Sequence, residues 1–333
     1  AATYTLRFIN QTNKSIFLTG KAGTGKTTLL KEIIATTHKN TVVVAPTGIA
    51  ALNANGVTIH SMFQLPFAAF IPDNKQLPHF SATVKFENRD SLGRHFKMNN
   101  VKRSVIRNME LLVIDEVSML RADVLDAMDF MMRKVRRNER PFGGVQVLFI
   151  GDLLQLPPVV KNEEWEMLKN YYRGMFFFHS HIIQQYPPLY IELDKIFRQT
   201  DAEFIDVLNN LRHNKITSED VQLLNQFVQP NFDLKKNKGF IILTTHNSKA
   251  DTINAQSLKD LEGKQFTYLP EITADFPEKI YPLEEQLQLK VGAQVMFIKN
   301  DLNFEKQFFN GKMGVISSLT EKEIFVHFPE ENK

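Results

Sequence analysis

Short runs of apolar residues recur along the first half of the chain, and stretches with helical periodicity separate them. The clearest runs cover residues 16–18, 41–45, 109–114 and 145–150. Continuous apolar runs of this length are typical of strands buried on both faces of a parallel sheet. Residues 122–138 instead predict a helix with one buried stripe: Val124, Met128, Met131 and Val135. This alternation of strands and helices predicts the α/β fold class.

The first apolar run leads into a glycine-rich turn, and a helical pattern follows. The turn fits the spacing G-x-x-x-x-G-K-[ST] in the strand-to-helix context where this pattern cradles phosphates. Its glycines let backbone N–H groups point inward, and the helix adds its positive N-terminal end. We therefore expect a nucleoside triphosphate to contact Gly20, Ala22, Gly23, Thr24, Gly25, Lys26, Thr27 and Thr28. Lys26 would reach the β and γ phosphates, and the Thr27 hydroxyl would bind Mg²⁺.

Acidic and amide side chains follow the last two apolar runs. Asp115 and Glu116 come directly after the third run. Asp115 would hold Mg²⁺ through water, and Glu116 would orient and deprotonate the attacking water. The fourth run ends at Gly151 and Asp152, and the next loop carries Gln155, whose amide suits a sensor of the γ-phosphate. Acidic pairs after strands are common by chance and capping alone explains Asp152, so this set depends on the phosphate loop upstream for its meaning.

Bulk composition limits the function classes. A chain of 333 residues is long enough for about two domains. Its cysteine count of zero excludes disulfides and thiolate metal sites and suits a reducing compartment. The net charge of +3 is only a weak sign of a polyanionic partner. No apolar run reaches the roughly 18 residues of a membrane helix. We expect a cytoplasmic location in a bacterium, or a nuclear or mitochondrial one in a eukaryote.

The regular pattern breaks down between residues 63 and 103, which suggests an insertion into the main sheet. Prolines, aromatic residues and scattered basic residues fill this stretch. Aromatic rings interleaved with cations can stack bases and neutralise phosphates. The alternative is that the phenylalanines form a small core of the insertion itself. We expect this for most of them, with one or two exposed, among Phe67, Phe70, Phe80, Phe86 and Phe96.

In this order, the motifs resemble those of superfamily-1 helicases and, more narrowly, of the Petite Integration Frequency (PIF) family of DNA helicases. The matching segments are Gly20–Thr27, Ala45–Gly48, Thr58–Ser61, Ile114–Met119 and Gly151–Pro158. The helix from Asp123 to Arg137, leading into Pro141–Gln146, resembles the segment that distinguishes this family. The resemblance implies ATP-driven 5′-to-3′ translocation on single-stranded DNA and unwinding of duplex, RNA–DNA hybrid or G-quadruplex structures. It also implies a role in DNA replication, repair, recombination or telomere maintenance.

The resemblance further implies two RecA-like P-loop NTPase domains with ATP in the cleft between them. The first would cover residues 1–188, with a wedge-like insertion at 63–103, and the second would start in residues 189–255, where 240–244 predict a strand. Short alternating strands with Gly and Asn turns at 256–333 predict a small β-barrel. The family carries an SH3-like insertion at this place.

Further site residues follow from the same resemblance. Arg198 would be the arginine finger that reaches the γ-phosphate across the cleft. Contacts to nucleic-acid phosphates are expected at Thr47, Gly48, His60, Ser61, Thr245, His246 and Asn247. We expect a monomer that binds single-stranded DNA and single-strand to duplex junctions.

Two motifs of the family do not occur before Lys333: a stretch like T-I-H-K-S-Q-G and one like V-A-L-S-R. The adenine-reading Gln is not evident either, because Gln11 lies too close to Gly20. We therefore expect the sequence to lack the remainder of the second RecA-like domain. Two alternatives stay open: a P-loop ATPase of another class, such as a clamp loader or remodeller, and a non-catalytic nucleic-acid-binding module.

Overall fold

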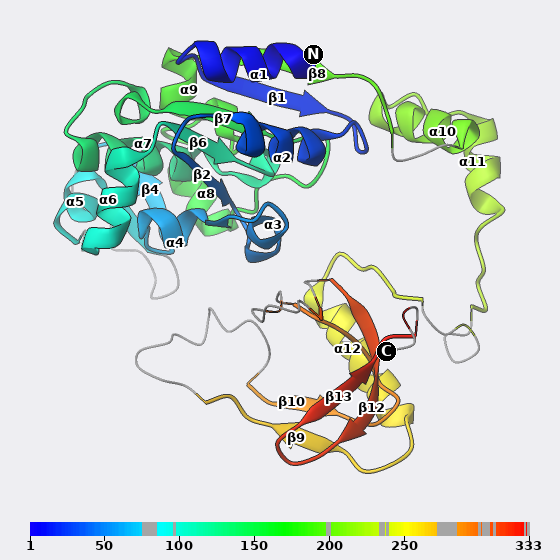
Figure 1. Ribbon diagram of the computed structural model, residues 1–333. Helices are drawn as coiled ribbons and strands as arrows, with labels where there is room; N and C mark the ends of the chain where they lie inside the picture. The colour runs from blue at the N-terminus through cyan, green and yellow to red at the C-terminus, as the bar shows by residue number, and fades with distance from the viewer. Residues whose placement is uncertain are drawn as a thin grey trace. The chain divides into compact units, whose positions relative to one another are not determined.

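The computed structural model describes residues 1–74, 85–95, 98–197, 201–232, 240–271, 285–298 and 311–329, with the single positions 237, 301, 307, 308 and 331. The chain divides into two compact units, residues 1–222 and 223–333, and each is described by itself (Figure 1). None of the described helices has the length and apolar character needed to span a membrane.

A six-stranded sheet forms the centre of the first unit, in the order β3-β2-β6-β7-β1-β8. Its strands are β1 (Ile16–Gly20), β2 (Thr41–Ala45), β3 (Val57–Thr58), β6 (Leu111–Ile114), β7 (Gln146–Ile150) and β8 (Leu189–Leu193). Every pair in the sheet is parallel. The four apolar runs thus form four neighbouring strands, and the predicted α/β fold class is confirmed. Their carboxyl ends meet at one edge, where ligands bind in open sheets of this kind.

Helices cover both faces of the sheet (Figure 1). The α-helices of this part of the chain are α1 (Ala2–Gln11), α2 (Lys26–Thr36), α3 (Gly48–Asn53), α4 (Ile59–Phe63), α5 (Arg89–His95), α6 (Asn100–Asn108), α7 (Ala122–Arg136), α8 (Asn162–Leu168), α9 (His181–Gln185), α10 (Ala202–Arg212) and α11 (Ser218–Asn225). Short 3₁₀ turns are η1 (Val117–Met119), η2 (Pro141–Gly144) and η3 (Phe177–His179). Along β6, Leu111 and Val113 join one hydrophobic core, whereas Leu112 and Ile114 join the other. This alternation places one core on each face.

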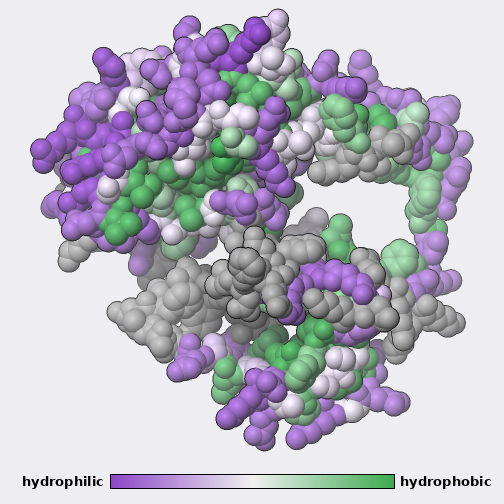
Figure 2. Space-filling model, in the orientation of Figure 1, coloured by the Kyte–Doolittle hydropathy of each residue, from purple (hydrophilic) through white to green (hydrophobic). Residues whose placement is uncertain are grey.

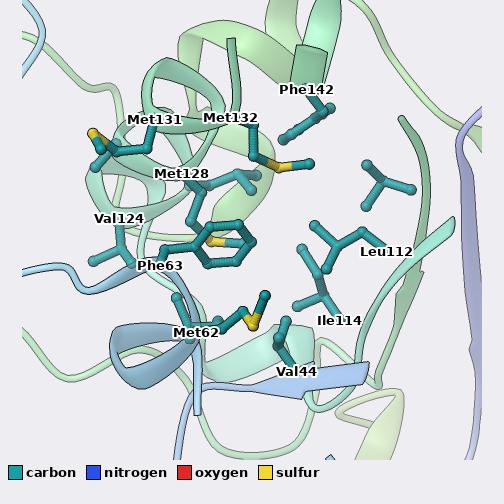
Figure 3. Packing of buried hydrophobic residues seen from close by; sticks show 14 of the residues in the cluster. Val44, Met62, Phe63, Leu112, Ile114, Val124, Met128, Met131, Met132 and Phe142 are labelled. Carbon is teal, nitrogen blue, oxygen red and sulfur yellow. The ribbon is translucent and has the colours of Figure 1, made fainter. Parts of the chain in front are cut away.

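The larger core lies between the sheet and α7. The predicted stripe of α7 is fully within it, since Val124, Met128, Met131 and Val135 are buried. Figure 3 shows the methionines of α7 gathered with Phe63, Leu112 and Ile114. Unbranched methionine side chains fill irregular gaps between helix and sheet well. On the face of the first unit that Figure 2 shows, hydrophilic residues predominate and hydrophobic residues form smaller patches.

Three buried aspartates on α7 accept hydrogen bonds from the backbone N–H groups of neighbouring segments. Asp123 accepts from Phe70 at 2.9 Å. Asp126 accepts from His181 at 2.9 Å and from the residue after it. Asp129 accepts from Phe142 at 2.7 Å. The insertion, α9 and η2 are therefore each fixed to α7 by a different carboxylate.

The insertion contains more regular structure than its sequence pattern predicts. Its strands β4 (Ala69–Ile71) and β5 (Phe86–Asn88) pair in parallel. The expectation that most phenylalanines pack inward holds for those described: Phe70 is buried, Phe86 packs against a small hydrophobic cluster, and Phe67 is 71% exposed. Phe80 and Phe96 lie outside the described residues.

The division between the units differs from the predicted domain boundary at residues 188 and 189. β8 pairs with β1 along five residues and so adds an edge strand to the first sheet. α10 also belongs to the first unit. The pattern of residues 189–193 predicts a strand but contains no information about which sheet it joins.

The second unit combines α12 (Asn247–Asp260) with short antiparallel strands: β9 (Phe266–Tyr268), β10 (Leu287–Leu289), β11 (Gln294–Met296), β12 (Met313–Leu319) and β13 (Ile324–His327). β9 pairs with β10, and β12 pairs with β11 and β13. The alternating strands were predicted, but those described form two separate sheets rather than one barrel. The predicted strand at 240–244 is wrong for this structure, because none of the described strands pairs with it and residues 240–243 are exposed.

Candidate nucleotide site and nucleic-acid interface

The predicted phosphate loop joins β1 to α2 and bends sharply at its glycines. Gly23 and Gly25 adopt φ angles of 78° and 85°, a region that favours glycine. At Gly20, a Cβ would lie 2.5 Å from the Leu193 carbonyl oxygen. A larger residue there would displace the loop, so the sequence pattern and the local packing require the same glycine.

Lys26 and Thr27 begin α2 at the end of this loop. The Lys26 ammonium donates to the carbonyl oxygens of Gly20 and Lys21, at 2.6 and 3.0 Å. Burial lowers the pKa of Lys26, whereas the charges of nearby acids act in the opposite direction: Asp152, Glu116 and Asp115. Thr27 is exposed beside it. The other predicted loop contacts comprise the buried Thr24, whose hydroxyl donates to the Lys21 carbonyl, and the exposed Ala22 and Thr28.

The acidic pair lies at the carboxyl end of β6, as predicted. Asp115 accepts a hydrogen bond from the Glu116 N–H at 2.9 Å. Glu116 has a φ of 50°, an uncommon conformation for a residue with a side chain, and such residues are found at functional turns. Burial raises the pKa of both carboxyls, and the Asp115 charge raises that of Glu116 further. A raised pKa favours a carboxylate that takes a proton from water.

Asp152 lies at the end of β7 and is only 1% exposed. Its carboxylate accepts from the Gln155 amide at 3.1 Å and from the Arg212 guanidinium at 2.7 Å. Burial alone would raise the pKa of Asp152, but these hydrogen bonds outweigh it and hold the pKa below its ordinary value. It also accepts from the Leu154 N–H, which fits the predicted capping role. Arg212 was not identified from the sequence.

The segment after β8 approaches the same loop. The Phe197 N–H donates to the Gly23 carbonyl at 2.8 Å, and a Cβ added at Gly25 would touch the Phe197 ring. Arg198, the predicted arginine finger, lies outside the described residues. Its neighbour in sequence therefore contacts the phosphate loop, while the role of Arg198 itself stays a prediction.

The predicted nucleic-acid contacts of the first unit lie after β2 and β3. Thr47 accepts from the Ala50 N–H, and Gly48 is exposed at the start of α3. His60 stacks on Phe67 with ring centroids 4.7 Å apart and planes at 15°. Ser61 is exposed, and its carbonyl accepts from Lys102 at 2.6 Å.

A hollow of about 340 Å³ lies beside His60. It is lined by His60, Ser61, Gln64, Leu65, Pro66, Glu87, Leu92 and Lys102. Aromatic faces next to a lysine suit the bases and phosphates of a single strand. The sequence placed His60 and Ser61 here, and the structure adds Phe67 and Lys102.

The remaining predicted contacts belong to the second unit. Thr245, His246 and Asn247 are exposed at the start of α12, and the Thr245 hydroxyl and a His246 ring nitrogen are 2.8 Å apart. Exposed polar groups at a helix start can meet phosphates. Among the residues that the structure describes, no three His, Cys, Asp or Glu side chains are grouped to hold a metal. A hydroxyl and one carboxylate, Thr27 and Asp115, stay the predicted Mg²⁺ ligands.

Comparisons with known proteins extend this description. The model of the PIF1-like helicase family matches residues 4–222. Human ATP-dependent DNA helicase PIF1 is 34% identical over 312 residues, which cover 91% of this chain and 44% of the human protein. The chain thus spans less than half the length of that relative.

Solved structures match over nearly the whole chain. A structure of a Pif1 helicase from Bacteroides in complex with ADP-AlF3 and ssDNA has a TM-score of 0.78 and 38% identity, and the match covers 100% of this chain and 72% of that one. A structure of two coordinating Pif1 helicases at forked dsDNA has a TM-score of 0.77 and 38% identity, covering 100% and 74%.

Proposed function

The chain belongs to the PIF1-like helicase family, and we propose that it is an ATP-dependent DNA helicase that moves 5′ to 3′ along single-stranded DNA. The observation that carries this proposal is the charged group at the carboxyl edge of the sheet. Lys26, Glu116 and Asp152 interact electrostatically there, although they follow three different strands. Phosphate chemistry needs this combination of a cation, a base and a phosphate-sensing loop.

The chain's own groups account for ATP hydrolysis. The backbone N–H groups of the loop and Lys26 hold the phosphates, while Glu116 takes a proton from the attacking water. The water oxygen forms a bond to the γ-phosphorus as the bond to the β–γ bridging oxygen breaks, which leaves ADP and phosphate. Thr27 and Asp115 would hold Mg²⁺, which spreads the phosphate charge when bound. Their hydroxyl and carboxylate oxygens suit this hard cation, and positive charge would favour the ionised form of the buried Asp115.

We expect DNA to bind to another surface of the first unit, formed by the residues that follow β2 and β3. Phosphates of the strand would meet Thr47, Gly48 and Ser61, and a base would stack on the His60–Phe67 pair. In the second unit, Thr245, His246 and Asn247 would add further contacts. Binding through phosphates should be largely independent of sequence and should weaken steeply with salt.

The finer features of the proposal rest on the family. They comprise two RecA-like domains that close on ATP, an SH3-like insertion, an arginine finger at Arg198 and a phosphate sensor at Gln155. RNA–DNA hybrids and G-quadruplexes are proposed as additional substrates, and a monomer as the active form. A DNA-maintenance role in the bacterial cytoplasm, or in the nucleus or mitochondria of a eukaryote, completes it.

The test compares Lys26→Ala and Glu116→Gln with the unmodified full-length protein. Both changes should abolish DNA-stimulated ATP hydrolysis and unwinding while single-strand binding persists. Lys31→Ala, an exposed lysine one turn further along α2, serves as the matched control. If either Lys26→Ala or Glu116→Gln still unwinds DNA, the mechanism is refuted. If the ATPase rate of the unmodified protein does not change when DNA is added, another class of P-loop ATPase is favoured. Substrates with only a 5′ or a 3′ tail decide the polarity.

A further inference from the structure

α10 contacts the proposed ATP site at two points, although no motif marks it. The Lys21 ammonium in the phosphate loop donates to the Asn209 side-chain oxygen at 2.6 Å. One turn later, the Arg212 guanidinium donates to Asp152 at 2.7 Å. The helix therefore joins the loop after β1 to the loop after β7, which carries Gln155.

The ion pair at Asp152 is protected from solvent. Asp152 is 1% exposed and the Arg212 side chain 20% exposed. Pairs of this kind lose little to screening, and removal of one partner leaves a buried charge that must find another. Among the described residues, the Lys26 ammonium at the same edge of the sheet also feels the charge of Asp152. Asp152 thus interacts with two cations, by an ion pair with Arg212 and by charge attraction with Lys26.

We propose that Arg212 is a positioning residue for ATP hydrolysis: by pairing with Asp152, it leaves Lys26 available to the phosphates and holds the loop that carries Gln155. The proposal rests on the proposed function, since it concerns the same reaction. Gln155 and Arg212 donate to the same oxygen of Asp152. Without Arg212, that oxygen would attract the Lys26 ammonium. ATP would then have to draw the ammonium away from Asp152 before Lys26 could contact the phosphates.

A purely structural role for the pair predicts different kinetics. If Arg212 only anchors α10, its loss lowers stability but leaves the KM for ATP unchanged in the folded protein. If Arg212 occupies Asp152 in place of Lys26, its loss raises the KM for ATP. Removal of the Asp152 charge in the same molecule then restores that KM, because no carboxylate is left to hold Lys26.

The experiment measures kcat and KM for ATP with saturating single-stranded DNA, on full-length protein, for Arg212→Ala, Arg212→Lys and Arg212→Ala combined with Asp152→Asn. We expect Arg212→Ala to raise KM at least about tenfold, as for the loss of a charged hydrogen bond. Arg212→Lys should recover part of this, and the double variant most of it. Lys215→Ala, an exposed cation three residues beyond Arg212, should leave KM unchanged.

The outcomes separate the inference from the function. If the unmodified protein hydrolyses no ATP, the proposed function fails. If it is active and Arg212→Ala leaves KM unchanged, or the double variant is no better than Arg212→Ala, the positioning role is overturned while the helicase assignment stands. The affinity for a fluorescent ADP analogue, measured without turnover, should rank the variants in the same order as the KM for ATP.

Discussion

Asp123 on α7 offers a direct test of how the first unit holds its insertion. Its side chain is 2% exposed. It accepts two hydrogen bonds from Arg121, at 2.9 and 2.8 Å, and one from the Phe70 N–H at 2.9 Å. Arg121 also donates to Glu164 at 2.7 Å. One carboxylate therefore links α7 to β4 directly and to α8 through the arginine.

We predict that Asp123→Asn, which preserves side-chain size and removes the charge, lowers the free energy of unfolding by about 3 kcal/mol. Removing one member of a buried ion pair costs roughly 3–5 kcal/mol. The lower end applies because Glu164 still faces Arg121 after the change. In a unit of this size, each kcal/mol moves the melting temperature by about 2–4 °C. The expected decrease is therefore roughly 6–12 °C.

Thermal unfolding followed by circular dichroism measures the decrease. Glu32→Gln makes the same carboxylate-to-amide change at an exposed position of α2 and serves as the control. Exposed substitutions usually stay within about 0.5 kcal/mol, so the control should move the midpoint by at most about 2 °C. A decrease for Asp123→Asn that is no larger than the control's would refute the claim that this carboxylate anchors the insertion.

Three further predictions test the packing, the charges and the surface of the first unit. Gly56→Ala should destabilise the fold by about 1–3 kcal/mol, because its Cβ would lie 2.4 Å from the Val43 carbonyl oxygen, whereas a Cβ at Gly48 meets nothing within 4 Å. Urea unfolding of Gly56→Ala and of the control Gly48→Ala checks this, and equal unfolding midpoints for the two variants would contradict it. Burial raises the pKa of Asp126 in the folded protein. The folded state therefore binds the carboxyl proton more tightly than the unfolded state does. As a result, the contribution of this carboxyl to stability falls as the pH rises from its pKa in the unfolded state through its pKa in the folded state. The stability difference between the unmodified protein and Asp126→Asn should therefore shrink toward higher pH, and a difference that grows would exclude this sign. Phe67→Ala should weaken single-strand binding by about 1–3 kcal/mol without lowering the melting temperature. Fluorescence anisotropy measures the affinity, with the exposed Tyr4→Ala as control, and unchanged DNA affinity would remove Phe67 from the interface.

Much of the first unit could be predicted because its central strands are buried on both faces. Such strands consist mostly of apolar residues, so β6 and β7 are visible without an alignment. The candidate site follows from the same fact. Parallel strands bring their carboxyl ends to one edge, which is why Lys26, Asp115 and Gln155 could be grouped from segments far apart in the sequence.

Other parts depend on partners that a local pattern does not contain. Arg212 lies 60 residues after Asp152, and its sequence context is that of any basic residue in the last turn of a helix. Phe67 resembles the other phenylalanines of the insertion until the structure places it against His60. The strand predicted at residues 240–244 also depends on a partner, because an apolar run forms a strand only when another strand pairs with it.

The aspartates of α7 show why buried acids are the hardest feature to predict. Asp123, Asp126 and Asp129 recur every three residues, a spacing that normally indicates the solvent face of an amphipathic helix. They are buried because each accepts a backbone N–H from a different segment. The apolar stripe alone would place α7 on the sheet without specifying what packs around it. Since a buried carboxylate is stable only where its donors are present, these three residues determine which segments lie beside the helix.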